Sequence, residues 1–427
     1  MEFHPVTSLT FSGYKAFKEK QTLHLKPLTL IFGYNNTGKS AAVRSLPLLA
    51  SSFSEGRKEM YEASYLDYSA ECVRGATFKD LAYGNGSKVS FGIKWGDTAS
   101  ISFELKQDGS DIEDLVSLEL AMAADLSSKK YTFRKSINDD AKNIYELSDN
   151  NEFKVEVNGF EVKANYKSEN IDFNSIFLRQ KEFSKSVNWL NSIRVHPPRE
   201  FRVGAGVELG VKYNGMGTAE TIWALAENNS PSFVMINKWL ADTCGRIIDI
   251  ERASSSTILN GRRMVRLDTV PSENDNGEAM IRVPILDLGE GIAQALPVVT
   301  LCAQATNGEL GKFPVVAIEQ PELHLHPKAT VVLANFIVKC INKNNNIRLV
   351  IETHSESLLI ALQIAIVDKA LDASDVSCNW VTGGKSGSII ESINFDDDAY
   401  ISDNWPEDVF RETLVQTRLL ITKRRER

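Results

Sequence analysis

Short alternating runs of hydrophobic and polar residues mark the N-terminal part of the chain. Strand-like runs lie at residues 9–11, 21–25 and 28–32, since alternation with a period of two is typical of half-buried strands. The last run is fully apolar apart from one threonine, which indicates a buried strand. A helix is predicted from Ser40 to about Ser52, and Pro47 is expected to kink or shorten it.

The pattern changes further along the chain. Residues 106–190 mix charged loops with alternating segments and predict a β-rich region, whereas residues 217–250 have helical spacing. After about residue 280, short apolar runs at 314–318 and 347–351 alternate with helical segments. This β–α alternation predicts a parallel sheet covered on both faces. We therefore expect an α/β fold.

The turn between the buried strand at 28–32 and the following helix carries a glycine-rich motif. It reads G-x-x-x-x-G-K-S and has the strand–loop–helix setting of a P-loop. Backbone N–H groups of such a turn surround phosphate, and the helix N-terminus adds its positive dipole end. Lys39 is predicted to reach the β- and γ-phosphates of ATP, and the Ser40 hydroxyl to hold Mg²⁺. The predicted cofactor-binding residues are Gly33, Asn35, Asn36, Thr37, Gly38, Lys39 and Ser40.

Two later strands end in polar side chains. The first is an apolar strand that ends in Glu319, as in the Walker B arrangement, and open α/β sheets bind ligands at this edge. Glu319 is predicted to hold the Mg²⁺ shell through water. Gln320 and Glu322 follow it and are candidate catalytic residues. The second strand leads into His354, whose imidazole is predicted to reach the γ-phosphate.

Composition narrows the setting of the protein. The net charge of −8 over 427 residues argues against a general coat of nucleic acid, although basic positions such as Lys129, Lys130 and Arg134 leave DNA binding open. Five scattered cysteines fit reduced thiols better than a disulfide framework or a zinc site. No signal peptide is recognised, and no apolar run approaches the ~20 residues that span a bilayer. We expect a cytoplasmic protein without a membrane partner.

The motifs, in this order, resemble those of a known group. A P-loop, a long insertion, I-E-Q-P-E-L-H-L-H-P at 318–327 and E-T-H-S-E at 352–356 are similar to the ABC-type ATPase domains of prokaryotic AAA-family proteins. Relatives of that group include SMC and recombination-repair ATPases, OLD nucleases and Septu-type defence ATPases. The resemblance covers residues 1–95 and 190–427. Residues 403–410 resemble a short C-terminal module of unassigned role in one branch of the group.

The resemblance implies a split ABC-type P-loop ATPase domain with a β-rich and helical insertion. The expected division is an N-terminal part of the ATPase domain at 1–95, a β-rich insertion at 96–190, a mixed helical and strand insertion at 191–280, a C-terminal part of the ATPase domain at 281–380, and the C-terminal module at 381–427.

The resemblance also implies a signature loop that reaches across a head-to-tail dimer to the partner's ATP. The candidate loop is residues 287–294, where Gly289 and Gly291 would present N–H groups to a γ-phosphate. The serine that usually supplies a hydroxyl there has no clear equivalent, and Ala293 occupies a matching position. A simple helix-capping turn remains the alternative.

A second departure concerns catalysis. The family usually places a catalytic Glu directly after the Walker B acid, whereas this chain has Gln320, which orients water but does not accept its proton. Glu322 is the candidate substitute. Phosphoryl transfer depends chiefly on positioning and electrostatics, so Gln320 does not forbid hydrolysis. Loss of a general base costs ~10²–10⁴-fold in rate, and slow turnover is expected.

Two functions remain open. The first is an ATP hydrolase that forms a homodimer or higher homo-oligomer around Mg-ATP and controls a separately encoded effector, such as a nuclease, in prokaryotic antiphage defence or DNA maintenance. The alternative is a non-hydrolysing scaffold in which ATP holds the effector inactive. Gln320 and the missing signature serine favour the scaffold, whereas Lys39, Ser40 and His354 fit both.

Overall fold

The structure is a computed structural model of the whole chain. It describes residues 3–54, 64–109, 112–124, 127–135, 144–163, 173–204, 206, 208–251, 258–259, 262–272, 281–401, 405–406, 410 and 412–425. Most of residues 403–410, the stretch that resembles the C-terminal module, therefore lies outside the described residues.

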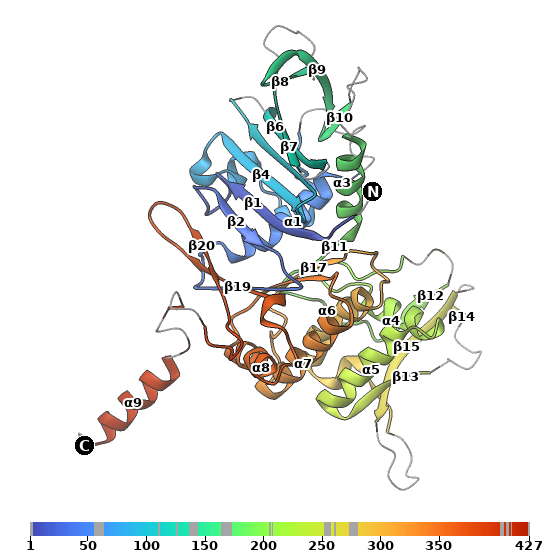
Figure 1. Cartoon of the computed structure of the whole chain (residues 1–427). Helices are drawn as coiled ribbons and strands as arrows, with labels where there is room; N and C mark the ends of the chain where they lie inside the picture. Colours follow the sequence, from blue (N-terminus) through green and yellow to red (C-terminus); the bar gives the residue numbers. More distant parts are fainter. Residues whose placement is uncertain are drawn as a thin grey trace.

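A nine-stranded antiparallel sheet forms the upper part of the molecule in Figure 1, in the order β10-β9-β8-β7-β6-β5-β4-β1-β2. β4 and β5 pair from Lys88 opposite Lys106 to Trp95 opposite Ala99. The sheet therefore runs on across the expected boundary at residue 95. Its strands are β1 (Val6–Ser12), β2 (Gln21–His24), β4 (Lys88–Trp95), β5 (Ala99–Lys106), β6 (Asp114–Ala124), β7 (Ser127–Lys135), β8 (Ile144–Leu147), β9 (Asn150–Asn158) and β10 (Glu161–Lys163).

A second sheet of six strands has the order β11-β17-β18-β3-β19-β20, and all of its pairs but the last are parallel. The N-terminal strand β3 lies between strands from the C-terminal third, which confirms the split α/β fold. The expected boundary at residue 380 falls inside β19. The strands are β3 (Leu28–Gly33), β11 (Val187–Leu190), β17 (Val315–Glu319), β18 (Arg348–Glu352), β19 (Val376–Thr382) and β20 (Ile389–Ile393).

Side chains of the six-stranded sheet alternate between two hydrophobic cores. Leu30 and Ile351 belong to the core shared with α6 (Glu290–Thr306), α7 (Pro327–Lys343) and α8 (Glu356–Val367). Ile31, Val350 and Ala317 belong to the other core, which contains α1 (Lys39–Ser52) and the inner face of the nine-stranded sheet. Both faces are covered as predicted, but the second face is covered by a sheet as well as a helix. α1 continues past Pro47 to Ser52, so the expected shortening does not occur.

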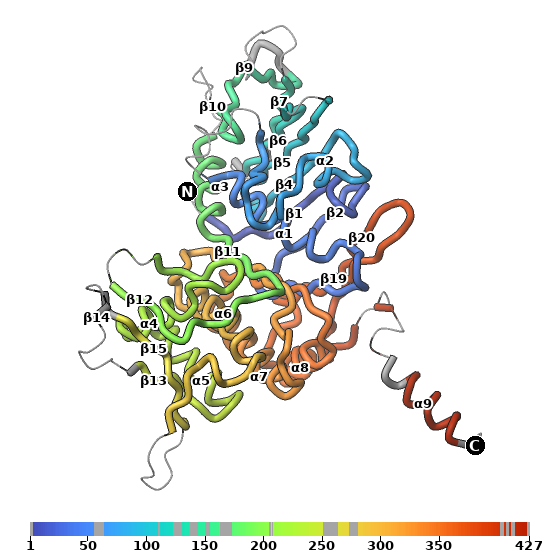
Figure 2. Tube along the Cα trace, turned by 180° about the vertical axis from the view of Figure 1, so that it is seen from behind, coloured from blue at the N-terminus to red at the C-terminus, as the bar shows by residue number. Residues whose placement is uncertain are grey.

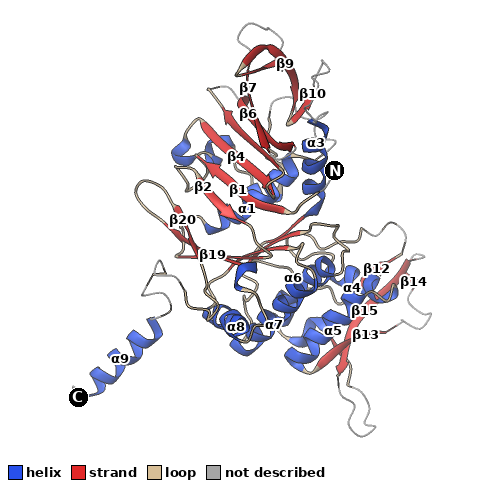
Figure 3. Ribbon diagram, viewed as in Figure 1, coloured by secondary structure: helices blue, strands red, loops and turns tan. Residues whose placement is uncertain are grey.

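The remaining elements flank these two sheets (Figure 3). A smaller sheet is built around β15 and lies beside α4 and α5. The helices outside the two large sheets are α2 (Phe78–Leu81), α3 (Phe173–Ser186), α4 (Thr218–Glu227) and α5 (Pro231–Cys244), with 3₁₀ turns at Glu71–Val73, Tyr83–Asn85, Ile285–Leu288 and Ala373–Asp375. The strands of the smaller sheet are β12 (Phe201–Val203), β13 (Arg246–Glu251), β14 (Ile258–Leu259), β15 (Arg262–Pro271) and β16 (Val283–Pro284).

The last helix, α9 (Glu412–Arg425), projects away from the rest of the molecule in both views (Figures 1 and 2). Among the described residues, none of the helices has the length and hydrophobicity needed to cross a bilayer.

Candidate nucleotide site

The loop Gly33–Ser40 joins β3 to α1, as the motif predicts. Two of its glycines are required by geometry. Gly38 caps α1 with φ 101°, and a Cβ at Gly33 would lie 2.5 Å from the carbonyl oxygen of Val381 on β19. Without such side chains the loop can turn closely over the end of the parallel sheet, where ligands of α/β folds bind.

Lys39 is buried and folded back onto its own loop. Its Nζ donates to the carbonyl oxygen of Tyr34 at 2.6 Å, and the Thr37 hydroxyl donates to the same oxygen at 2.9 Å. Burial lowers the pKa of Lys39, although Glu352 opposes this. Asn35 and Asn36 are exposed at the loop tip, and Asn36 has φ 64°. The structure thus brings the predicted loop residues together around one backbone turn.

Two carboxylates at the ends of neighbouring strands face α1. Glu319 ends β17 and Glu352 ends β18, and they are paired residues in the parallel register. Ser40 Oγ donates to Glu352 Oε1 at 3.0 Å. One turn later on α1, Arg44 donates from Nε and Nη2 to the two carboxylate oxygens of Glu319, each at 2.6 Å. The helix therefore holds each carboxylate with a different side chain.

Glu319 is enclosed by its partners. It is 2% exposed, and Trp189 Nε1 donates to it at 3.0 Å. The Arg44 guanidinium also lies over the Trp189 ring, 5.7 Å from its centroid, and Trp189 stacks on Tyr213. The charge of Glu319 is thus balanced by Arg44. Its water-mediated role at Mg²⁺ stays a prediction.

Glu352 has a different environment. It is 3% exposed, and its Oε2 atom has no hydrogen-bond partner among the residues that the structure describes. Burial and the neighbouring Glu319 raise the pKa of Glu352, while Ser40 and Lys39 act in the opposite direction. A buried carboxylate oxygen without a donor is a fitting ligand for a cation.

Gln320 and Glu322 both connect the end of β17 to that of β18. Gln320 has φ 47°, and its N–H donates to the carbonyl oxygen of Glu352 at 2.7 Å. Glu322 Oε1 accepts the Thr353 hydroxyl at 2.7 Å and the His354 N–H at 2.9 Å. Burial raises the pKa of Glu322. The turn at Pro321 therefore brings Glu322 to the strand end, where it holds the backbone before His354.

His354 is exposed at the same edge of the sheet, as expected for a residue that meets a ligand. Partial desolvation and the Lys39 charge lower the pKa of His354. Its imidazole is therefore neutral at pH 7 and has both a donor and an acceptor nitrogen.

The candidate signature loop lies at the start of α6. Gly289 is exposed, has φ 105° and precedes the helix, and no atom lies within 4 Å of a Cβ built on it. Gly291 differs, because its Cβ would lie 2.5 Å from the His324 carbonyl oxygen. A close contact inside the same chain therefore requires glycine at 291. Gly289 has no such contact and faces open space.

Sequence reasoning missed Arg194, which joins this loop to the end of β17. Arg194 is 3% exposed; its guanidinium donates to the carbonyl oxygens of Gln294, at 3.2 Å, and of Glu319. Burial lowers the pKa of Arg194 to about 10. Sequence reasoning also gave no role to Arg44, Trp189 or Glu352. The spacing of Arg44 four residues after Ser40 was the available signal for the first.

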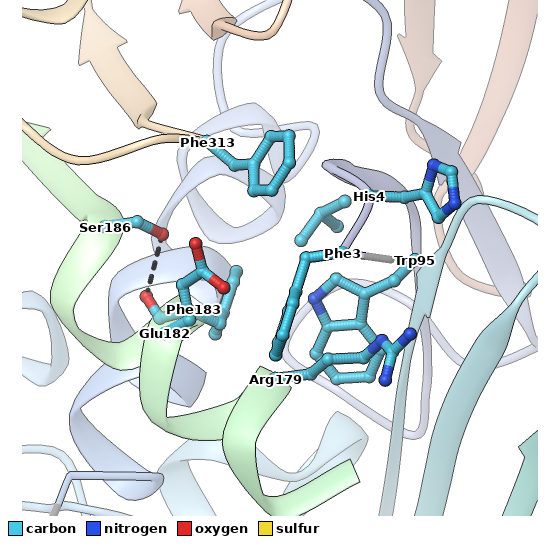
Figure 4. A pocket seen from close by; sticks show the side chains of 9 residues that line it. Phe3, His4, Trp95, Arg179, Glu182, Phe183, Ser186 and Phe313 are labelled. Atoms are coloured by element: carbon cyan, nitrogen blue, oxygen red, sulfur yellow. Dashed lines mark hydrogen bonds between the residues drawn. The ribbon is translucent and has the colours of Figure 1, made fainter. Parts of the chain in front are cut away.

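Two cavities lie outside the loop itself. One of about 350 Å³ adjoins the first turns of α1 and is lined by Lys15, Arg44 and Arg74 among others, so its surroundings favour an anion. The other, shown in Figure 4, lies between Trp95, Arg179 and Phe313 and measures about 10 Å³. It is too small for a nucleotide.

The described residues contain no group of three or more His, Cys, Asp or Glu side chains placed to hold a metal. Mg²⁺ at phosphate-binding sites is usually held by one or two carboxylates together with the substrate phosphates and water. Ser40 and the strand-end carboxylates fit that pattern.

Comparisons with known proteins support part of this picture. Residues 247–359 match the sequence model of the AAA ATPase domain. The matched segment includes the two strand-end carboxylates and His354, and the P-loop lies before it. The match agrees with the family resemblance of the motifs. Among curated proteins, none matches the chain in sequence.

Solved SMC head domains are distantly similar in structure. An SMC head bound to the C-winged helix domain of ScpA is 13% identical with a TM-score of 0.48, covering 92% of this chain and 98% of that chain. The SMC head domain from Thermotoga maritima is 11% identical with a TM-score of 0.42, covering 91% and 99%. An SMC head with an extended coiled coil, bound to the C-terminal domain of ScpA derived from Pyrococcus furiosus, is 10% identical with a TM-score of 0.42, covering 99% of each chain. These likenesses are too distant to carry a functional argument.

Proposed function

We propose that the protein binds Mg-ATP at the loop Gly33–Ser40 and uses ATP binding, with slow hydrolysis, to control a partner protein. The observation that carries this proposal is the meeting of Lys39, Ser40 and the β18 strand end at one edge of a parallel sheet. The AAA ATPase domain match at residues 247–359 supports it from an independent source. Lys39 would release Tyr34 and contact the phosphates, and Ser40 would contact Mg²⁺.

The proposed reaction is in-line attack of water on the γ-phosphate. Gln320 and His354 would orient the water and the γ-phosphate, since neither residue is ionised at pH 7. Glu322 holds the Thr353 hydroxyl and the His354 N–H, so its proposed contribution is to position His354 rather than to take the proton. Turnover would therefore depend on positioning and be slow.

Nucleotide binding and turnover test this proposal directly. Lys39→Ala should weaken ATP binding by about 100-fold or more, since the lysine is the main cation at the loop. Isothermal titration of the full chain with Mg-ATP measures the affinity, and Lys385→Ala, at an exposed lysine outside the loop, is the control. Equal affinity of Lys39→Ala and the unchanged protein would refute the P-loop assignment.

We further propose that ATP favours a head-to-tail homodimer in which Gly289 of one chain faces the nucleotide of the other. The exposure of Gly289 and the hydrogen bonds of Arg194 to Gln294 and Glu319 support this arrangement, because they connect the loop to the nucleotide edge. Sedimentation with and without Mg-ATP tests it. A shift of a population from 1:99 to 99:1 dimer requires ~5.5 kcal/mol of differential binding.

The partner would be a separately encoded effector, such as a nuclease, in prokaryotic antiphage defence or DNA maintenance. A non-hydrolysing scaffold is the second candidate, and Gln320 at the usual place of the base favours it. Tight Mg-ATP binding without turnover above the Lys39→Ala background would support the scaffold. Direct DNA binding is tested by affinity at low salt and its decline with rising salt.

A further inference from the structure

We propose that Glu352, rather than Glu319, is the carboxylate that meets Mg²⁺ in the nucleotide site. This inference rests on the proposed binding of Mg-ATP. It reverses the usual expectation that the acid at the end of the Walker B strand takes this place. Three features support it: the sheet register, the pairing of each carboxylate with α1, and the Oε2 atom of Glu352, which has no partner among the described residues.

The register places Glu352 one strand closer to the phosphate loop. In the six-stranded sheet, β18 pairs directly with β3, and Glu352 lies opposite Ile31. β17 is one strand further away, and Glu319 lies opposite Glu352. Neighbouring strands are about 4.8 Å apart, so Glu319 starts about 10 Å from the strand that leads into the loop.

Both carboxylates point to the α1 side of the sheet. Ala317 and Val350, two residues before Glu319 and Glu352, belong to the core that contains α1. Because side chains of a strand alternate between its faces, Glu319 and Glu352 share that side. The orientation of the two carboxylates therefore does not show which of them meets the metal. Their hydrogen-bond partners do differ.

Those partners are Ser40 and Arg44, which lie on one face of α1 because they are four residues apart. Ser40, the predicted metal ligand, donates to Glu352. Arg44 occupies both oxygens of Glu319, and Trp189 adds a third donor. A metal beside Ser40 would lie next to Glu352, whereas Glu319 would first have to break both of its bonds to the half-buried Arg44.

The Oε2 atom of Glu352 is a further difference from Glu319, whose two carboxylate oxygens both accept hydrogen bonds. It is buried and has no hydrogen-bond partner among the described residues, in a side chain that is 3% exposed. A buried carboxylate oxygen is costly unless a donor or a cation meets it. Mg²⁺, or a water of its shell, supplies that contact, and carboxylate oxygen is the ligand type it prefers.

The test compares metal affinity in matched variants of the full chain. Glu352→Gln and Glu319→Gln make the same substitution on adjacent strands, and Glu391→Gln changes an exposed carboxylate on β20 as a control. Each protein is saturated with ATP, and Mn²⁺ binding is followed by the electron paramagnetic resonance of free Mn²⁺. We expect about tenfold or greater loss of Mn²⁺ affinity in Glu352→Gln, a much smaller loss in Glu319→Gln, and none in the control.

Two further measurements separate the possible causes. ATP affinity in the presence of EDTA should be the same in Glu352→Gln as in the unchanged protein, because the loop and Lys39 are intact. The melting temperature of nucleotide-free Glu352→Gln should not fall, because the change removes a buried charge with an unmatched oxygen. A lower melting temperature together with lost ATP affinity would show a damaged fold and would overturn this reading of the variant.

The outcomes also distinguish this inference from the proposed function. If the unchanged protein binds no ATP with or without Mg²⁺, the proposed function fails. If it binds Mg-ATP but Glu319→Gln loses as much Mn²⁺ affinity as Glu352→Gln or more, the assignment to Glu352 fails. Retained Mn²⁺ affinity in both variants would mean that Ser40 and the phosphates hold the metal without either carboxylate.

Discussion

The ion pair between Arg44 and Glu319 gives the sharpest test of how the site is built. Replacing Arg44 by Met keeps a long apolar stem against the Trp189 ring and removes both donors. Glu319, which is 2% exposed in the unchanged protein, would then keep the Trp189 N–H as its remaining donor among the described residues. We infer that the buried charge of Glu319 is stabilised by Arg44. Removing Arg44 should therefore strongly destabilise the fold.

The expected size follows from the two bonds of 2.6 Å. Hydrogen bonds to charged groups contribute about 1.5–3 kcal/mol each. Removal of one partner of a buried ion pair costs about 3–5 kcal/mol. The retained indole donor and the 16% exposure of Arg44 place the expected loss at the lower end, about 3 kcal/mol.

Urea unfolding at pH 7, followed by circular dichroism and tryptophan fluorescence, measures this loss. Glu319→Gln and the double variant complete a cycle, in which a coupling energy of about 2 kcal/mol is expected because the neutral amide needs no cation. Arg199→Met is the matched control. Arg199 also holds a carboxylate with two bonds, to Asp287, but both side chains are exposed.

The exposed pair should contribute less than about 1 kcal/mol. A loss in Arg44→Met no larger than that in Arg199→Met would refute the reasoning, as would an absence of coupling in the cycle. Either result would mean that Glu319 does not depend on Arg44 and is available for another partner.

Three further predictions concern the nucleotide edge and the loop. Gln320→Glu should raise ATP turnover, by up to about 100-fold, if a missing base limits the rate; an unchanged rate in a coupled assay contradicts this. Glu322→Gln should stabilise the protein more at pH 7 than at pH 4. The pKa of Glu322 is raised in the folded protein, so above the ordinary pKa of about 4.3 the folded state binds more protons than the unfolded state, and stability falls as the pH rises. The amide of the variant does not titrate and lacks this penalty. A stabilisation measured by thermal unfolding that does not change with pH would count against it. Gly289→Leu should weaken ATP-dependent dimerisation in sedimentation, whereas Gly308→Leu, with a similar positive φ and open surroundings, should not. Equal effects of the two would point to backbone strain instead.

Local sequence pattern predicted the main elements of the α/β fold. The buried strand at 28–32, the glycine-rich turn and the helix that follows appear as β3, the loop and α1. The strand end at Glu319 also appears as expected, and the apolar run at 347–351 appears as β18, which ends at Glu352. These features are short in sequence, and glycine, lysine and apolar residues at fixed spacing leave few alternatives for the backbone there.

Domain limits were harder to predict, because they depend on which strands pair. Residues 88–95 and 99–105 both have the alternating pattern of a strand, but alternation does not tell a strand which neighbour it joins. The nine-stranded sheet therefore crosses residue 95, and β19 crosses residue 380.

The sequence by itself determined that the chain carries a P-loop within an α/β fold and which residue types line its edge. Only the tertiary structure decided which carboxylate meets which side chain of α1. Ser40 and Glu352 are 312 residues apart, and Arg44 and Glu319 are 275 residues apart. Their pairing depends on the order of β17, β18 and β3 in one sheet and on the rotation of α1 above it. Those are set by the packing of whole elements, which no local pattern records.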